Sequence, residues 1–116
     1  EYLIKQRADV NSRDTSEQTP LLWAAENGHF YIVQLLCDNG CDVNAFNRQR
    51  KTSLYCAAKN GHTEIVEYLL RRGADMEIKD KYDRSPKDMA ERMGHTNIVE
   101  ILRQFTNPLY LQQVTQ

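Results

Sequence analysis

The chain has 116 residues, enough for one ordinary domain. Its formal net charge is −1, with 41% hydrophobic and 27% charged residues, so the basic excess of a nucleic-acid-binding groove is absent. Apolar runs are only a few residues long, too short to span a bilayer, and we therefore expect neither a nucleic-acid partner nor a membrane partner.

Residues 1–13 match a later part of the chain. Their sequence, EYLIKQRADVNSR, aligns with EYLLRRGADMEIK, which is Glu67 to Lys79. The later segment is the second half of a repeating unit, so we expect residues 1–13 to be the C-terminal half of a truncated unit. We also expect the parent protein to continue upstream, because half a unit leaves a helix without its partner.

Residues 14–46 form the first whole unit, with two predicted helices. Thr19 and Pro20 begin the first helix, since threonine caps free N–H groups and proline fits the first helical position. The sequence NGH at 27–29 ends this helix and turns the chain. A second helix is predicted over residues 30–38 from its helical apolar spacing, and Gly40 ends it.

The same pattern recurs 33 residues later in the unit 47–79, where TSLYCAAKNGHTEIVEYLLRRG follows TPLLWAAENGHFYIVQLLCDNG. A looser copy occupies residues 80–106. There Lys87 and Glu91 stand at the positions of Leu54 and Ala58, which indicates a C-terminal capping unit with one face in water. Residues 107–116 are predicted to be a tail, either disordered or folded back over the last helices.

The 33-residue period, the T-P-L…A…G-H pattern and the glycine–histidine pairs in register resemble the ankyrin-repeat family along nearly the whole chain. The resemblance implies an all-α repeat solenoid in which each unit is a β-turn plus an antiparallel helix pair. It also implies a monomeric array whose units contact their nearest neighbours.

The spacing of the cysteines and histidines does not indicate a metal site. The cysteines, at positions 37, 41 and 56, lack the spacing of a disulfide framework or a zinc site, so we interpret them as reduced thiols that pack as small hydrophobes. Reduced thiols favour a cytoplasmic or nuclear location. The histidines, at positions 29, 62 and 95, occur once per unit and are interpreted as structural residues of the helix–helix turn. No cofactor is expected.

Catalytic motifs are missing from the sequence. It contains no nucleophile elbow, P-loop, HExxH motif or glycine-rich fingerprint. Asp42 and Asp75 recur at the repeat period and are interpreted as turn residues that bind local backbone. We therefore expect no enzymatic activity in these residues.

Function is expected where the units differ, because core positions repeat and the others are free to vary. In ankyrin-repeat proteins the β-turn tips and inner helices line a concave groove for partner proteins. The resemblance therefore implies a non-catalytic protein–protein interaction module. The candidate partner-binding residues are Tyr55, Lys59, Arg48, Lys51, Tyr82, Arg84, Arg92, Trp23, Glu26 and Phe46.

The aromatic candidates have separate interpretations. Tyr55 and Tyr82 are expected to face outward, since both positions do so in the family pattern. Trp23 matches Cys56 of the next unit, at a position that packs between helices in the family, so a core and a groove placement both stay open. Phe46 lies beside a tip, and the sequence does not decide whether it contacts a partner.

The tips become increasingly cationic along the chain. Together with two inner-helix cations they form what we call the basic strip: Arg48, Arg50, Lys51, Lys59, Lys81, Arg84 and Arg92. The strip is either an ordinary solvated surface or a groove that favours an acidic or phosphorylated segment of a partner protein.

Two other functions stay open. The chain could be a scaffold or regulatory segment of a multidomain protein with catalysis elsewhere. It could instead be a receptor that binds a nucleotide or small molecule by stacking on Trp23 and Tyr55. Asn44 resembles the loop asparagine that an intracellular oxygenase hydroxylates in some ankyrin proteins, with an ordinary turn asparagine as the alternative.

Overall fold

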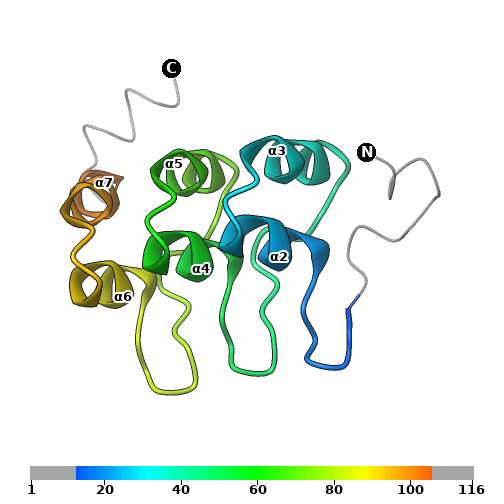
Figure 1. Ribbon diagram of the computed structural model, residues 1–116, viewed down its shortest axis with the longest axis horizontal. Helices are drawn as coiled ribbons and strands as arrows, with labels where there is room; N and C mark the ends of the chain where they lie inside the picture. The colour runs from blue at the N-terminus through cyan, green and yellow to red at the C-terminus, as the bar shows by residue number, and fades with distance from the viewer. Residues whose placement is uncertain (1–12, 106–116) are drawn as a thin grey trace.

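The computed structural model of the chain describes residues 13–105. Six helices follow one another there in three pairs: α2 (Pro20–Glu26) and α3 (Phe30–Asp38), α4 (Ser53–Lys59) and α5 (Thr63–Arg71), α6 (Pro86–Arg92) and α7 (Thr96–Phe105). Figure 1 shows α2, α4 and α6 in one row, which we call the inner helices, and α3, α5 and α7 in a second row, the outer helices. Within the same residues the only extended pairing is an isolated bridge between Phe46 and Thr52. The predicted all-α repeat solenoid is confirmed.

Each inner helix begins at a hydroxyl side chain. Thr19, Thr52 and Ser85 accept a hydrogen bond from the backbone N–H group three residues further on. Ser85 also donates its own N–H to the carboxylate of Asp88 at 2.9 Å, which completes a capping box. Such a cap is worth about 1 kcal/mol, so these three residues fix where the inner row starts.

The outer helix α3 ends in a Schellman motif. The N–H of Cys41 donates to the carbonyl of Leu36 at 3.2 Å, and the N–H of Gly40 donates to the carbonyl of Cys37 at 3.3 Å. Gly40 has φ +85°, a left-handed conformation that glycine adopts without steric cost. The predicted stop at Gly40 therefore has a geometric cause.

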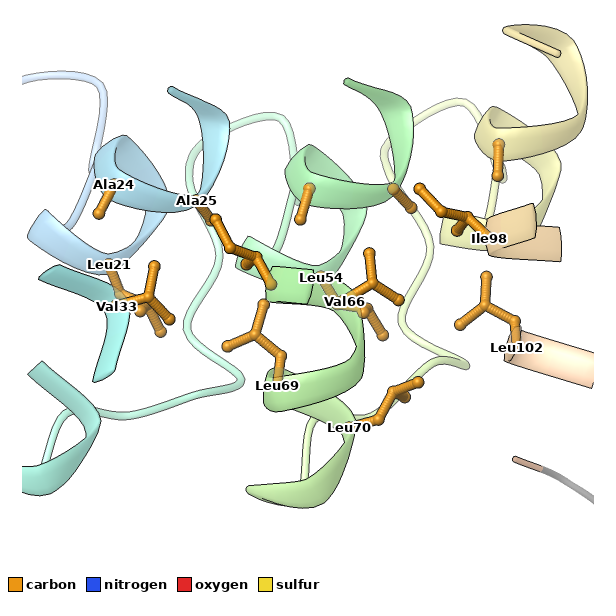
Figure 2. Close-up of a cluster of buried hydrophobic side chains, with 14 of the residues drawn as sticks. Leu21, Ala24, Ala25, Val33, Leu54, Val66, Leu69, Leu70, Ile98 and Leu102 are labelled. Atoms are coloured by element: carbon orange, nitrogen blue, oxygen red, sulfur yellow. The ribbon is translucent and has the colours of Figure 1, made fainter. Parts of the chain in front are cut away.

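One apolar cluster runs through all three helix pairs and forms the core. Figure 2 shows its members pointing into the space between the two rows, among them Leu21, Val33, Leu54, Val66, Leu69, Ile98 and Leu102. The inner helices contribute alanines that are completely buried, which lets α4 pack closely against both α2 and α6. The stability of each pair therefore depends on its neighbours.

The third pair differs from the second on its inner helix. Leu54 and Ala58 of α4 are fully buried, whereas Lys87 and Glu91 at the matching positions of α6 are exposed. Polar residues here keep the end of the inner row compatible with water. The predicted half unit 1–13 (apart from Arg13) and the predicted tail 107–116 lie outside the described residues. None of the helices described is long and apolar enough to cross a membrane.

Candidate functional site

The three loops ahead of the inner helices, which we call the tips, comprise residues 14–18, 47–51 and 80–84. Each tip is organised by one side-chain oxygen, of Asp14, Asn47 or Asp80, which accepts two backbone N–H groups two and four residues further on. One residue of each tip has a left-handed backbone, with φ between 61° and 67°. Asp and Asn suit such turns because their short side chains bind nearby backbone. The sequence pattern alone did not identify these organising residues, although they recur at the repeat period.

The tips are joined to one another by main-chain hydrogen bonds. The N–H of Arg48 donates to the carbonyl of Ser16 at 3.1 Å, and the N–H of Lys81 donates to the carbonyl of Gln49 at 3.0 Å. The side chain of Arg48 also donates from Nε to the carbonyl of Thr15 at 2.9 Å. The loops that hang side by side in Figure 1 are therefore a connected surface, in which hydrogen bonds hold the backbones that carry the basic side chains next to one another.

Tyr55 lies in the interior, so the prediction that its side chain faces outward is wrong. It is only 3% exposed and packs with Leu22, Cys56 and Met89 in a small cluster of its own. Its hydroxyl donates to Oδ2 of Asp80 at 2.7 Å. Because Asp80 organises the third tip, the inward rotamer of Tyr55 anchors that tip to the second helix pair. Sequence periodicity could not show this bond, since the matching positions hold Leu22 and Asp88.

The Tyr55–Asp80 bond affects both pKa values. Burial raises the pKa of Tyr55 well above its ordinary value, and donation to the Asp80 carboxylate raises it further. For Asp80, burial alone would raise the pKa. The hydrogen bonds that it accepts from the Tyr55 hydroxyl and two tip N–H groups outweigh burial, so the pKa of Asp80 lies below its ordinary value.

A polar pocket of about 150 Å³ lies between the second tip and the inner helices. Its lining includes Glu26 from α2, Lys51 from the tip and Lys59 from α4. The Lys51 ammonium lies 5.8 Å from the centre of the Tyr55 ring, at the floor of the pocket. Four of the predicted partner-binding residues are thus brought together, with the Glu26 carboxylate and two ammonium groups around the pocket and Tyr55 in its wall.

The third tip presents an aromatic ring between two cations. Tyr82 is 65% exposed, in agreement with its expected outward position. The Lys81 ammonium lies 5.3 Å and the Arg84 guanidinium 5.6 Å from the centre of its ring. Tyr82 is exposed and Arg84 half-buried beside it, and tyrosine and arginine are among the residue types most enriched at binding hot spots.

The cations of the basic strip differ in their pairing from four of the six other cations in residues 13–105. Arg13, Arg72, Lys79 and Arg103 each lie within 4.0 Å of a carboxylate. Within residues 13–105, by contrast, none of the seven cations of the strip forms an ion pair. Their charges are therefore not neutralised by direct contact with this part of the chain.

The remaining candidates lie beside these groups. Trp23 is 49% exposed, with its ring centre 4.9 Å from that of His29, so this tryptophan belongs to the surface rather than to the core. Phe46 is 39% exposed and lies 5.7 Å from the guanidinium of Arg50. Arg92 is exposed at the end of α6.

The histidines connect successive helix pairs. Nε2 of His62 donates to the carbonyl of Glu26, and Nε2 of His95 donates to the carbonyl of Lys59, each at 3.0 Å. The His62 ring lies so close to Gly28 that a Cβ there would be 2.7 Å from the imidazole. This geometry supports the interpretation of structural histidines. No group of three or more His, Cys, Asp or Glu side chains able to hold a metal occurs in residues 13–105.

Asn44 holds two turns together. Oδ1 of Asn44 accepts the N–H of Asp75 at 2.7 Å, and Nδ2 donates to the carbonyl of Gly73 at 3.3 Å. Asp42 and Asp75 each accept the N–H two residues further on, so their interpretation as turn residues is confirmed. Hydroxylation of Asn44 stays a prediction.

Comparison with protein families gives one match. A model described as ankyrin repeats (3 copies) matches residues 1–80 and 47–110. A search of curated proteins finds no match. The two matched segments overlap and together include all six helices.

Proposed function

Because the chain belongs to the ankyrin-repeat family, we propose that it is a non-catalytic module that binds an acidic segment of a partner protein along its tips and inner helices. Ankyrin repeats generally act as protein-interaction modules, and the family is typically non-catalytic. The repeat boundaries that belong to this proposal are 14–46, 47–79 and 80–106, preceded by a partial repeat at 1–13.

The observation that carries the proposal is the set of unpaired cations beside exposed aromatic rings. Cations gathered around the tips repel one another, and the carboxylates of Glu26 and Asp80 offset part of this repulsion. An external anion would offset more of it. Four of the six cations elsewhere in residues 13–105 do lie beside carboxylates, whereas Arg71 and Lys87, like the strip, form no ion pair. What sets the strip apart is that seven such cations gather around the tips and the ends of the inner helices.

Two anchor points fit an extended acidic segment. The pocket with Lys51 and Lys59 suits a carboxylate, although Glu26 at its edge selects against a second negative charge placed there. The second anchor is Tyr82 with Lys81 and Arg84, which suits a carboxylate next to an apolar side chain. Trp23, Phe46, Arg48 and Arg92 flank these anchors, whereas Tyr55 supports the third tip from inside.

The nucleotide alternative is weaker on this structure. It requires Trp23 and Tyr55 as stacking rings, and the Tyr55 ring is almost completely buried. A scaffold or regulatory role in a larger protein remains compatible with the proposal, since such a role would use the same surface.

Charge reversal on the strip tests the proposed function. We expect Lys51→Glu combined with Lys81→Glu to weaken binding of a fluorescein-labelled glutamate-rich peptide about tenfold, that is by about 1–2 kcal/mol, as measured by fluorescence anisotropy. Arg71→Glu is the matched control, because Arg71 is an exposed cation on the outer helix α5, away from the tips. The effect should shrink in high salt, because exposed charges are screened.

Several results would contradict the proposal. Equal affinities for the double variant and for Arg71→Glu would show that the strip does not hold the peptide. Binding that does not change with salt would exclude an electrostatic mode. A phosphoserine peptide of the same length distinguishes phosphate recognition from carboxylate recognition, because only the former would make the phosphorylated peptide clearly tighter.

A further inference from the structure

The turn after α3 brings two of the three cysteines together. The Cys41 thiol donates to Sγ of Cys37, with the two sulfurs 3.8 Å apart. Both thiols are free in this structure. Cys37 is 6% exposed and belongs to the core cluster, whereas Cys41 is only partly buried and packs against the edge of the same cluster.

The Schellman motif places the two thiols next to each other. Gly40 leaves the helix with a left-handed backbone, so Cys41 folds back over the last turn of α3 instead of continuing the helix. A disulfide requires the two sulfurs to be about 2.05 Å apart. The sulfurs therefore have to approach each other by less than about 2 Å. Cys41 lies just after the end of the helix and is only partly buried.

The bond from Cys41 and the charge of Arg72, at the C-terminal end of α5, make Cys37 the more acidic thiol. Donation from Cys41 lowers the pKa of Cys37 below that of an ordinary thiol, against the opposing effect of burial, and the positive charge of Arg72 adds to the lowering. The Arg72 guanidinium is held there by bonds to the Cys37 carbonyl at 2.9 Å and to Asp38 at 3.0 Å. The same S–H···S bond raises the pKa of Cys41, which keeps its proton.

We propose that Cys37 and Cys41 form a modification site, a dithiol that hydrogen peroxide oxidises to an intrachain disulfide across the end of α3. The Cys37 thiolate attacks the peroxide O–O bond, an S–O bond forms, and hydroxide leaves and is protonated to water. The Cys41 sulfur then attacks the Cys37 sulfur, the S–O bond breaks, and water leaves with the Cys41 proton. Two thiols supply two electrons, and one peroxide is reduced to two waters.

Cys56 is a control within the same molecule. It is 5% exposed, which is close to the exposure of Cys37, but it packs with Leu22, Tyr55 and Met89 instead of with a second thiol. Burial raises the pKa of the Cys56 thiol to about 12. Burial alone therefore predicts similar access of peroxide to Cys37 and Cys56, whereas the proposed dithiol predicts selective oxidation of the first.

The experiment treats the reduced full chain with one equivalent of hydrogen peroxide, alkylates the remaining thiols and digests with a protease that cleaves before aspartate. Because Asp38 lies between the two cysteines, cleavage separates Cys37 from Cys41 unless a disulfide joins them. We expect the fragment 38–41 to remain linked to the fragment that ends at Cys37, with Cys56 alkylated. Oxidation at Cys37 should be about tenfold faster than at Cys56.

Variants separate the two steps. Cys41→Ser removes the resolving thiol, so Cys37 should stop at a sulfenic acid that dimedone traps. Cys56→Ser should form the disulfide like the unmodified chain. The proposal would be overturned by equal oxidation of Cys37 and Cys56 or by a disulfide that includes Cys56. It would also be overturned if the two fragments were not linked and Cys37 carried the alkyl group, which marks a thiol that peroxide did not oxidise. Circular dichroism checks that the variants fold. If Cys41→Ser does not fold, the fragments of the unmodified chain still test whether the disulfide forms.

Discussion

At the scale of single residues, the Tyr55–Asp80 bond shows how one side chain connects the interior to a tip. Oδ1 of Asp80 accepts two N–H groups of the third tip, and Oδ2 accepts the hydroxyl of Tyr55. A single carboxylate thus positions the loop that carries Lys81, Tyr82 and Arg84. Its charge state should therefore affect stability.

Acidification should destabilise the protein partly through Asp80. Its pKa is lowered on folding, so its contribution is fully present above the ordinary value near 3.8 and is lost as the pH falls through the folded pKa. Urea unfolding of the unmodified chain between pH 7 and pH ~3 should show the free energy of unfolding falling in this acidic range. Asp80→Asn, which cannot titrate, should lose less over the same interval. Asn47 already organises the second tip, so asparagine is compatible with this turn.

Tyr55→Phe provides a second check on the same bond. It removes the hydroxyl donor, leaves the Asp80 carboxyl in place and should cost about 1–2 kcal/mol at neutral pH. It should also flatten the acid dependence, because the pKa of Asp80 is then lowered less. Identical acid dependence in the unmodified chain, Asp80→Asn and Tyr55→Phe would show that the bond does not set this pKa.

The Gly28–His62 contact predicts unequal effects at two glycines. Gly28→Ala and Gly40→Ala both force alanine into a left-handed conformation, which costs about 1–2 kcal/mol each. Only Gly28→Ala also places a methyl group against an imidazole, since among residues 13–105 no neighbouring atom lies within 4 Å of a Cβ at Gly40. Chemical denaturation should therefore show the larger loss for Gly28→Ala.

A double-mutant cycle tests the cause of that difference. His62→Ala removes the ring that the new methyl would meet, so Gly28→Ala should cost less in the His62→Ala background than in the unmodified chain. Strict additivity of the two changes would mean that backbone strain alone explains the loss at Gly28.

At the scale of elements, the sequence predicted the first helix pair closely and the side-chain directions less well. The outer helix at 30–38 and its end at Gly40 follow from the spacing of apolar residues and from the glycine that ends the helix. Both are features of the local sequence and need no contact with another unit. The burial of Tyr55 depends on Asp80, 25 residues away in another unit. The S–H···S contact of Cys37 depends on how the turn after Gly40 folds back. Periodicity does not report such contacts, because each occurs in one unit only.

The position of α4 between α2 and α6 predicts unequal costs for the same substitution. Leu54 in α4 is 0% exposed and Leu102 in α7 is 1% exposed, so the buried surface lost on change to alanine is nearly the same. Leu54→Ala loosens contacts with the helix pairs on both sides and should cost about 4–5 kcal/mol, near the upper end for such changes. Leu102→Ala should cost about 2–3 kcal/mol, because α7 packs mainly on α5 and α6 within residues 13–105.

Thermal or urea unfolding followed by circular dichroism measures both changes. Native-state hydrogen exchange adds a local comparison, since Leu102→Ala should release protection mainly in α6 and α7 and Leu54→Ala in all three helix pairs. Equal destabilisation and equal spread of lost protection would contradict nearest-neighbour coupling between the pairs.

At the scale of the whole molecule, binding and stability use different sets of positions. The residues that repeat hold the rows together, as the core cluster in Figure 2 shows. The residues that vary form the tips and the basic strip. The strip was predictable because charge is visible in sequence. Its lack of ion pairs within residues 13–105 was not, because pairing depends on distances between side chains.

The glycine–histidine contact also bears on how such a chain can grow. Each helix pair presents glycine at one side and histidine at the other, and the junction Gly28–His62 is repeated at Gly61–His95. The two sides of a unit are complementary at this contact, so duplicating residues 47–79 in the gene would create a junction whose glycine and histidine already fit. Among residues 13–105, no atom lies within 4 Å of the position of a Cβ at Gly94. Lengthening this array by duplication therefore preserves the glycine–histidine contact, whereas contacts made in one unit, such as that of Tyr55 with Asp80, would have to be replaced.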